Sequence, residues 1–174
     1  MPNIDNFKAA LGAGGARPNQ FGVRILWPNG AGPATDGDST YHTMVTGAAL
    51  PASNVNPTIL QYRGRELKLA GERTFDPWTI TIVNDTGFTL RNAFEDWMEL
   101  MNNKVDNGGE TIPNNYMGGF DVTHLDRNDS RIAEYALFNA FPINMSEIAL
   151  QYAQNDVIEE YTVTIQFSHY ERTL

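Results

Sequence analysis

The sequence predicts a mainly β fold, an antiparallel β-sandwich or barrel of about seven to nine strands with one flanking α-helix. It also predicts a single domain over residues 1–174. Three observations support this. Several short segments alternate apolar and polar residues, which is the period of a half-buried strand. Turn-forming Gly, Pro, Asn and Asp separate these segments, and only one stretch repeats apolar residues at helical spacing.

The N-terminal region begins with a Gly- and Ala-rich stretch, residues 1–20, which predicts a flexible arm with one helical turn. The first strand is expected at 21–27, where Phe21, Val23 and Ile25 point to one face. Residues 28–40 predict an exposed loop because Gly, Pro, Asn and Asp dominate them. Residues 41–45 predict the next strand.

Residues 50–73 predict an extended loop and hairpin. Pro51 and Pro57 make residues 50–57 an irregular connection, since proline cannot donate to a ladder. Strands at 58–62 and 66–69 then flank a tight turn in which Gly64 supplies a positive φ. The turn therefore carries two arginines, Arg63 and Arg65, at the hairpin tip.

The central elements are a strand at 79–83 and a helix at 90–101. Thr and Ile alternate along the strand, which predicts one buried apolar face and one hydroxylated face. The helix turns a stripe of Leu, Phe, Trp and Met toward the core, and residues 84–87 offer capping side chains before it.

In the C-terminal part, residues 102–131 predict a polar, irregular segment that contains a short strand near 120–124. A strand over 132–141 is expected to stop at Pro142, and residues 146–151 fit either a strand or an irregular crossing. Alternation over residues 161–170 predicts one long strand. The core residues expected from all these patterns are Trp78, Ile80, Ile82, Phe94, Trp97, Val163, Ile165 and Phe167.

The composition of the chain argues against several classes of function. Twelve Lys plus Arg against 21 Asp plus Glu give a net charge of −9, which disfavours a general grip on nucleic-acid phosphates. The absence of cysteine excludes disulfides and thiolate chemistry. The sequence shows no secretory signal and no membrane-spanning run, so we expect a soluble protein that is not exported and does not contact a membrane.

No catalytic, metal or cofactor site is expected, and the chain is not predicted to be an enzyme. His42, His124 and His169 lie far apart, without the close spacing of a metal site. The acidic loops that begin at Asp36 and Asp126 lack the glycine and glutamate that a calcium loop requires at its sixth and twelfth positions. What remains is an acidic sheet protein with an arm and a hairpin.

Several motifs follow one another in a characteristic order along residues 17–171. They are ARPNQF, ALPAS, LAGERTFDPWTITIVND, an amphipathic helix with FEDWMELM, FNAFPINMSEIALQY and EEYTVTIQFSHYE. Together they resemble tail tube proteins of contractile-tailed bacteriophages. The most specific part is GERTFDPWT with Asn84 and Asp85, although the family usually has Asp-Asp-Trp where this chain has Asp-Pro-Trp.

The resemblance implies a virion protein, assembled in the host cytoplasm, that forms homohexameric rings. The inner sheets of the subunits would join into a ring-shaped barrel, and stacked rings would form a hollow tube inside a contractile sheath. DNA would pass through the lumen into the host cell without specific binding. Expected partners are further copies of the chain, the sheath protein, and baseplate and tail terminator proteins. Ring closure would also use up exposed strand edges.

By the same resemblance, the arm at 1–20 and the region 50–73 would contact neighbouring subunits. The residues assigned to such contacts are Arg63, Arg65, Glu72 and Arg73. The alternative is that the hairpin is an exposed, solubilising turn. The hydroxylated strand faces are candidates for the channel wall or for the surface that meets the sheath, and the negative charge would either repel DNA or simply keep the protein soluble.

Two other functions stay open from the sequence. One is the tube of a related contractile machine, such as a pyocin-like particle or the haemolysin-coregulated tube of type VI secretion. The other is a carbohydrate-binding jelly roll that uses Trp27, Trp78 and the loop acids.

Overall fold

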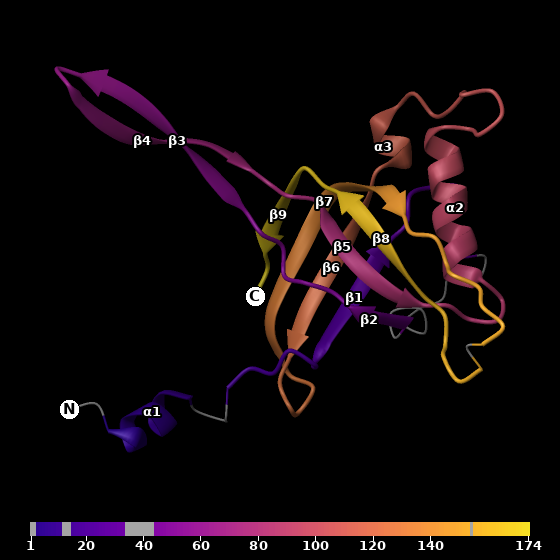
Figure 1. Cartoon of the computed structure of the whole chain (residues 1–174), viewed down its shortest axis with the longest axis horizontal. Coiled ribbons are helices and arrows are strands. Elements are labelled where there is room, and N and C mark those ends of the chain that lie inside the picture. Colours follow the sequence, from indigo (N-terminus) through magenta and orange to yellow (C-terminus); the bar gives the residue numbers. More distant parts are fainter. Residues whose placement is uncertain (1–2, 12–14, 34–43, 154) are drawn as a thin grey trace.

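The computed structural model describes residues 3–11, 15–33, 44–153 and 155–174. Within them the chain forms three helices and nine strands (Figure 1). Their bounds are α1 Ile4–Leu11, β1 Phe21–Leu26, β2 Val45–Gly47, β3 Asn54–Tyr62, β4 Arg65–Thr74, β5 Trp78–Val83, α2 Thr89–Met101, α3 Pro113–Tyr116, β6 Gly118–Leu125, β7 Arg131–Met145, β8 Glu160–Gln166 and β9 His169–Arg172.

Seven strands form one antiparallel sheet in the order β1-β6-β7-β8-β5-β2, with β9 also paired to β7. The sheet curls into a nearly closed barrel, which confirms the predicted mainly β class. The remaining strands, β3 and β4, pair only with each other and project from this body (Figure 1). We refer to them as the hairpin.

The core lies between the curled sheet and α2, which covers it (Figure 1). Trp97 of α2 stacks on Phe94 and on Phe120, with ring centroids 6.1 Å apart in each pair. Its indole Nε1 donates to the carbonyl oxygen of Tyr116 at 2.6 Å, so the buried nitrogen is satisfied. Each of the eight expected core residues is at most 4% exposed: Trp78, Ile80, Ile82, Phe94, Trp97, Val163, Ile165 and Phe167.

The start of α2 is held by Asp85. Its carboxylate accepts hydrogen bonds from the backbone nitrogen and the hydroxyl of Thr89, at 2.8 and 2.7 Å. The N-cap residue itself, Phe88, has a φ of 53° and makes no side-chain cap. Desolvation acts to raise the pKa of Asp85, but the hydrogen bonds from Thr89 outweigh it and the pKa lies below its usual value.

Two of the expected strand ends are wrong. β7 runs through Pro142 to Met145, because a register shift between Pro142 and Asn144 accommodates the missing donor. The long C-terminal strand is also divided, into β8 and β9. Both pair with β7, and the backbone nitrogen of Ser168 between them still donates to Phe138, but only β8 has β5 on its other side.

Other differences concern the connections. Residues 54–57 are not irregular, because they belong to β3, with a register shift between Val55 and Pro57. Residues 146–151 form the irregular crossing rather than a strand. The arm was expected to contain one helical turn, whereas α1 has eight residues, and α3 was not predicted. Of the strand expected at 41–45, Val45 opens β2, while residues 41–43 and the loop at 34–40 lie outside the described residues.

Candidate functional site

The hairpin is largely uncovered by the rest of its own chain. Of its strand residues, only Gly71 is partly buried, and every other one is exposed. A Cβ at Gly71 would lie against the Asn56 carbonyl oxygen and 2.8 Å from Thr58 Oγ1, so glycine permits the close pairing of the two strands. Since a two-stranded sheet has little stability of its own, such a ribbon gains from contact with another surface.

The strand register gives the hairpin two different faces. Residues paired directly across an antiparallel ladder share a face, and Leu60 pairs with Leu67 while Tyr62 pairs with Arg65. The other face carries the pairs Ile59 with Lys68 and Gln61 with Glu66. We define the apolar face of the hairpin by four side chains that are 46–67% exposed: Leu60, Tyr62, Leu67 and Leu69.

The hairpin tip is a two-residue turn with cationic side chains. Arg63 and Gly64 have φ angles of 47° and 81°, as a two-residue I′ turn requires. The Arg63 guanidinium lies 5.4 Å from the Tyr62 ring centroid. Among the described residues, no ion pair engages Arg63, Arg65 or Lys68.

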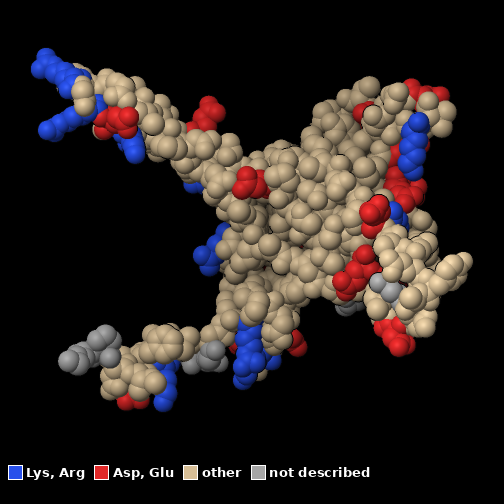
Figure 2. Space-filling view, viewed as in Figure 1, with Lys and Arg blue, Asp and Glu red and all other residues tan. Residues whose placement is uncertain are grey.

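The charge of the hairpin is opposite to that of the rest of the chain. Residues 54–74 hold four Lys or Arg and two Glu, a net charge of +2, which leaves −11 for the remainder of a chain whose total is −9. Figure 2 shows blue side chains at the hairpin tip and red ones across the opposite side of the body. The tip is therefore a cationic projection from an acidic molecule.

The four residues assigned to subunit contacts all lie on the hairpin but do not form one cluster. Arg63 and Arg65 are at the tip, whereas Glu72 and Arg73 lie near the base of β4. At this base the Asn54 amide donates to the Asp76 carboxylate at 2.7 Å. The structure therefore places Arg63 and Arg65 at the tip of the hairpin, apart from Glu72 and Arg73 near its base.

The outer faces of the barrel differ from one another. On β5 and β8, Thr79 and Thr164 place their hydroxyls 3.3 Å apart, and Thr81 is paired with Thr162. On β1 and β6, Arg24 is paired with Asp121 instead. Desolvation raises the pKa of Asp121 above its usual value, although the charge of Arg24 opposes the shift. One face is mainly hydroxylated, with Glu160 at its end as the partner of Val83, and the other carries an Arg–Asp pair.

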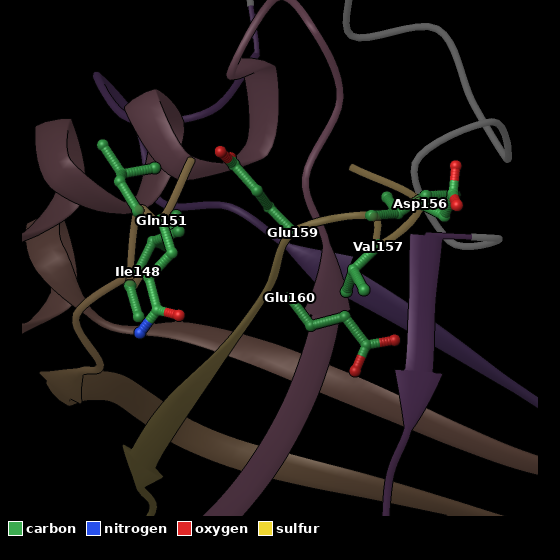
Figure 3. A pocket seen from close by; sticks show the side chains of 9 residues that line it. Ile148, Gln151, Asp156, Val157, Glu159 and Glu160 are labelled. Atoms are coloured by element: carbon green, nitrogen blue, oxygen red, sulfur yellow. The ribbon is translucent and has the colours of Figure 1, made fainter. Parts of the chain in front are cut away.

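The sequence did not predict a hollow at the connection from β7 to β8. It measures about 690 Å³ and is lined by residues 148–151 and 156–160 (Figure 3). In this connection Leu150, Tyr152, Val157 and Ile158 are 67–106% exposed. The sequence signal that could have indicated this hollow is the segment 147–160, which contains apolar and acidic residues but no Lys or Arg.

The N-terminal arm contains a second uncovered apolar surface. On α1, Ile4, Phe7 and Leu11 share one side at helical spacing and are 66%, 64% and 42% exposed. The helix buries none of its residues and lies away from the body (Figure 1).

The histidines have structural contacts where they are described. His124 Nε2 is 2.8 Å from the Arg17 carbonyl oxygen, and the His169 ring stacks on Phe138 with centroids 5.0 Å apart. His42 and the loop at Asp36 lie outside the described residues. Across the described ranges, no three His, Cys, Asp or Glu side chains converge in a metal-binding arrangement, and none of the helices there is long and apolar enough to span a membrane.

The tryptophans of the carbohydrate-binding hypothesis are not available as a sugar platform. Trp78 is 4% exposed, and its Nε1 donates to the Ala49 carbonyl oxygen at 2.6 Å. Trp27 packs against Phe94 and Trp97, with centroids 5.0 and 5.4 Å away. Both rings pack in or against the core, so that hypothesis is wrong in the two tryptophans it assigned.

A barrel with an uncovered hairpin and apolar arm is the architecture of an assembly subunit. The chain belongs to the phage tail tube protein family, whose model matches residues 16–173, and its role is that of a structural tube subunit. The tail tube protein gp19 of Enterobacteria phage T4 is 28% identical over 97% of this chain and 99% of its own length. The tail tube protein of Serratia phage KSP90 is 25% identical over 96% and 95% of the two chains.

Solved structures share the fold at low sequence identity. A chain of the anti-feeding prophage baseplate has a TM-score of 0.63 at 12% identity, covering 90% of this chain and 94% of its own. A chain of the sheath-tube complex of the PVC extracellular contractile injection system has a TM-score of 0.61 at 12% identity, with 95% of each chain covered. The SPP1 tail tube reaches 0.56 at 12% identity, over 90% of this chain and 78% of its own.

Proposed function

We propose that this chain forms hexameric rings that stack into a hollow tube, and that the tube conducts DNA into the host cell. The observation that carries the proposal is the hairpin, which exposes an apolar face and a cationic tip that its own chain leaves uncovered. Exposed apolar surface of this kind marks a contact with another molecule. In a tube, that molecule is another copy of the chain.

Ring formation also follows from the open sheet. β2 ends the strand order of the barrel on one side, where among the described residues it pairs with β5 alone. Unpaired edges are templates for pairing with another chain, and a head-to-tail contact around a rotation axis closes into a ring. A joint barrel of several subunits is wide enough for an aqueous channel, whereas the barrel of one subunit is filled by its core.

The outer faces of the barrel supply two candidates for the channel wall. The Thr face of β5 and β8 carries Glu160 but no Lys or Arg, so it offers no cation that would hold a passing phosphate backbone. The face of β1 and β6 carries Arg24, which is paired with Asp121. We infer that DNA passes without specific binding, because the chain outside the hairpin has a net charge of −11.

The partners proposed beyond the ring are a contractile sheath protein, baseplate proteins and a tail terminator. Chains of similar fold occur in a sheath-tube complex, a baseplate and a tube-terminating cap. The role of this chain in these assemblies would be structural rather than catalytic. Assembly would take place in the host cytoplasm, and residues 1–20 and 50–73 would contact neighbouring subunits.

A related contractile machine is the second candidate. Structures from extracellular contractile injection systems share the fold, which favours it. The full-length similarity to the tail tube protein of a phage favours a phage tail. Isolation of particles that carry this chain distinguishes the two, since a phage tail is attached to a DNA-filled capsid and the other machine is not.

The test of the tube itself is assembly of the purified chain, followed by sedimentation and negative-stain electron microscopy. We expect stacked rings with a central hole. A chain that stays monomeric at every concentration, including in the presence of a preformed baseplate, would contradict the proposal. Arg63→Glu combined with Arg65→Glu is expected to reduce assembly, and normal tubes from this variant would remove the two arginines from the contact.

A further inference from the structure

The hollow at the connection from β7 to β8 is lined by apolar and acidic side chains. Five of its lining residues are Ile148, Ala149, Leu150, Val157 and Ile158. The others are Gln151, Asp156, Glu159 and Glu160. Figure 3 shows the acidic side chains of Asp156, Glu159 and Glu160 around this space. We refer to it as the β7–β8 hollow.

The apolar side chains of the hollow are as uncovered as those of the hairpin. Leu150 is 79% exposed, Val157 is 67% exposed and Ile158 is 69% exposed. On the apolar face of the hairpin, Leu60 and Leu67 are 49% and 54% exposed. Covering one set with the other would remove both from water, and each large aliphatic side chain fully buried in this way contributes about 1.5–3 kcal/mol.

The charges of the two surfaces are complementary. Residues 147–160 contain four Asp or Glu and no Lys or Arg. The hairpin carries a net charge of +2. Glu159 already accepts a hydrogen bond from the Asn84 amide at 3.0 Å, whereas Asp156 and Glu160 are exposed and stand free for an incoming cation. Complementary charge of this kind favours one partner and one orientation.

The two surfaces lie at opposite ends of the molecule. The hairpin projects from one end of its long axis, and the connection from β7 to β8 lies at the other (Figure 1). The hairpin therefore does not reach the hollow of its own chain. A contact between different surfaces at opposite ends is heterologous, and it repeats from copy to copy without limit or until a ring closes.

We propose that the hairpin of one copy docks its apolar face in the β7–β8 hollow of a second copy, with Arg63 and Arg65 against Asp156 and Glu160. This inference rests on the proposed tube and names the surface that receives the hairpin. The arginines suit this role because they pair bidentately with carboxylates and keep their charge when partly buried. The opposite face of the hairpin, with Ile59 and Lys68, remains outside the contact.

Cysteine cross-linking tests the docking directly, because the chain has no native cysteine. The variant with Leu67→Cys and Val157→Cys should give, in assembled tubes under mild oxidation, a ladder of disulfide-linked subunits on a denaturing gel. The matched control is Ile59→Cys with Val157→Cys, since Ile59 is 50% exposed on the opposite face of the same hairpin. Tubes that give no ladder with Leu67→Cys, or an equal ladder with the control, would overturn the inference.

Charge exchange gives a second test that does not depend on disulfide geometry. Arg63→Glu with Arg65→Glu, and separately Asp156→Arg with Glu160→Arg, should each raise the concentration required for assembly by about tenfold or more. The combined four-residue variant should recover most of that loss. Asp96→Arg is the control, because this exposed carboxylate lies on α2 outside the hollow, and it should leave assembly near that of the wild type.

The outcomes separate this inference from the function on which it rests. A thermal unfolding curve for each variant shows whether the body has folded. If the wild-type chain forms no tubes, the proposed function fails and this inference fails with it. If the wild type forms tubes but the combined variant recovers nothing and no cross-link forms, the tube stands and the hairpin docks elsewhere.

Discussion

The barrel body and the hairpin consist of strands with the same alternating pattern, yet one is covered by its own chain and the other is not. Ile80 in β5 is fully buried, while Leu60 on the apolar face of the hairpin is 49% exposed. The body has α2 and a curled sheet to cover its apolar face, and the hairpin has only its own second strand. Alternation thus predicts which side of a strand is apolar, but not which molecule covers it.

The difference has an energetic consequence. Core side chains contribute to the stability of the free subunit, because their burial is complete before any partner arrives. The apolar face of the hairpin can contribute fully only after another surface covers it. We therefore expect core changes to lower the free energy of unfolding, and hairpin changes to act mainly on assembly.

The largest effect on folding should come from Trp97→Ala. It removes a fully buried ring stacked on Phe94 and Phe120, and the expected loss in the free energy of unfolding is about 3–5 kcal/mol. Urea denaturation of the monomer measures it. The counterpart Tyr62→Ala on the hairpin should change this quantity by no more than about 0.5 kcal/mol. Equal losses in the two variants would remove the distinction between the regions.

A smaller effect is expected from Gly118→Ala at the start of β6. An added Cβ would meet the carbonyl oxygen of Leu26 in β1 and would lie 2.8 Å from the Trp97 ring, so a strand or the helix must shift, at a loss of about 1–3 kcal/mol in the free energy of unfolding. Gly22→Ala in β1 is the control, because no atom of the described residues lies within 4 Å of a Cβ there. If both variants unfold at the same urea concentration, Gly118 is not a site of close packing.

Asp85→Ala should cost about 1 kcal/mol, since it removes the acceptor of two hydrogen bonds at the start of α2. The pKa of Asp85 is lower in the folded state than its usual value of 3.8. Its stabilisation is thus fully present above that value and is lost as the pH falls through the lower, folded pKa. The gap between wild type and variant in thermal unfolding should close in strong acid. A gap independent of pH would assign the loss to something other than the carboxylate charge.

The smallest effect on folding is expected from removal of most of the hairpin. Replacement of residues 58–69 by Asn-Gly joins Pro57 to Ala70, which are cross-strand partners, through a two-residue turn. The melting temperature of the body should stay near that of the wild type, while tube assembly is lost. A large fall in melting temperature would show that the hairpin supports the body, contrary to its exposure.

The sequence was a good guide where short-range patterns and the chain's own core coincide. α2 and the buried Ile of β5 follow from spacing alone, and the tip turn follows from Gly64, whose φ is 81°. The sequence was a poor guide where the rule that proline ends a strand was offset by a register shift in the ladder. Pro142 stays within β7, and Pro57 within β3, because a register shift beside each absorbs the missing donor.

The alternation of apolar and polar residues could not predict the division of the C-terminal strand or the β7–β8 hollow. Residues 160–172 alternate almost without interruption, and the break at Phe167 and Ser168 lies opposite Asn139 of β7, whose φ is 53°. The hollow arises from an irregular segment without periodicity. Both features depend on contacts between segments far apart in the sequence.

The most direct test of the central claim, that each hairpin is completed by another copy, is a cryo-EM reconstruction of tubes assembled from the purified chain. We predict stacked rings in which Leu60, Tyr62 and Leu67 of every subunit are buried against a neighbouring copy. Rings in which these side chains remain in solvent, or in which the hairpin folds back on its own barrel, would contradict the account.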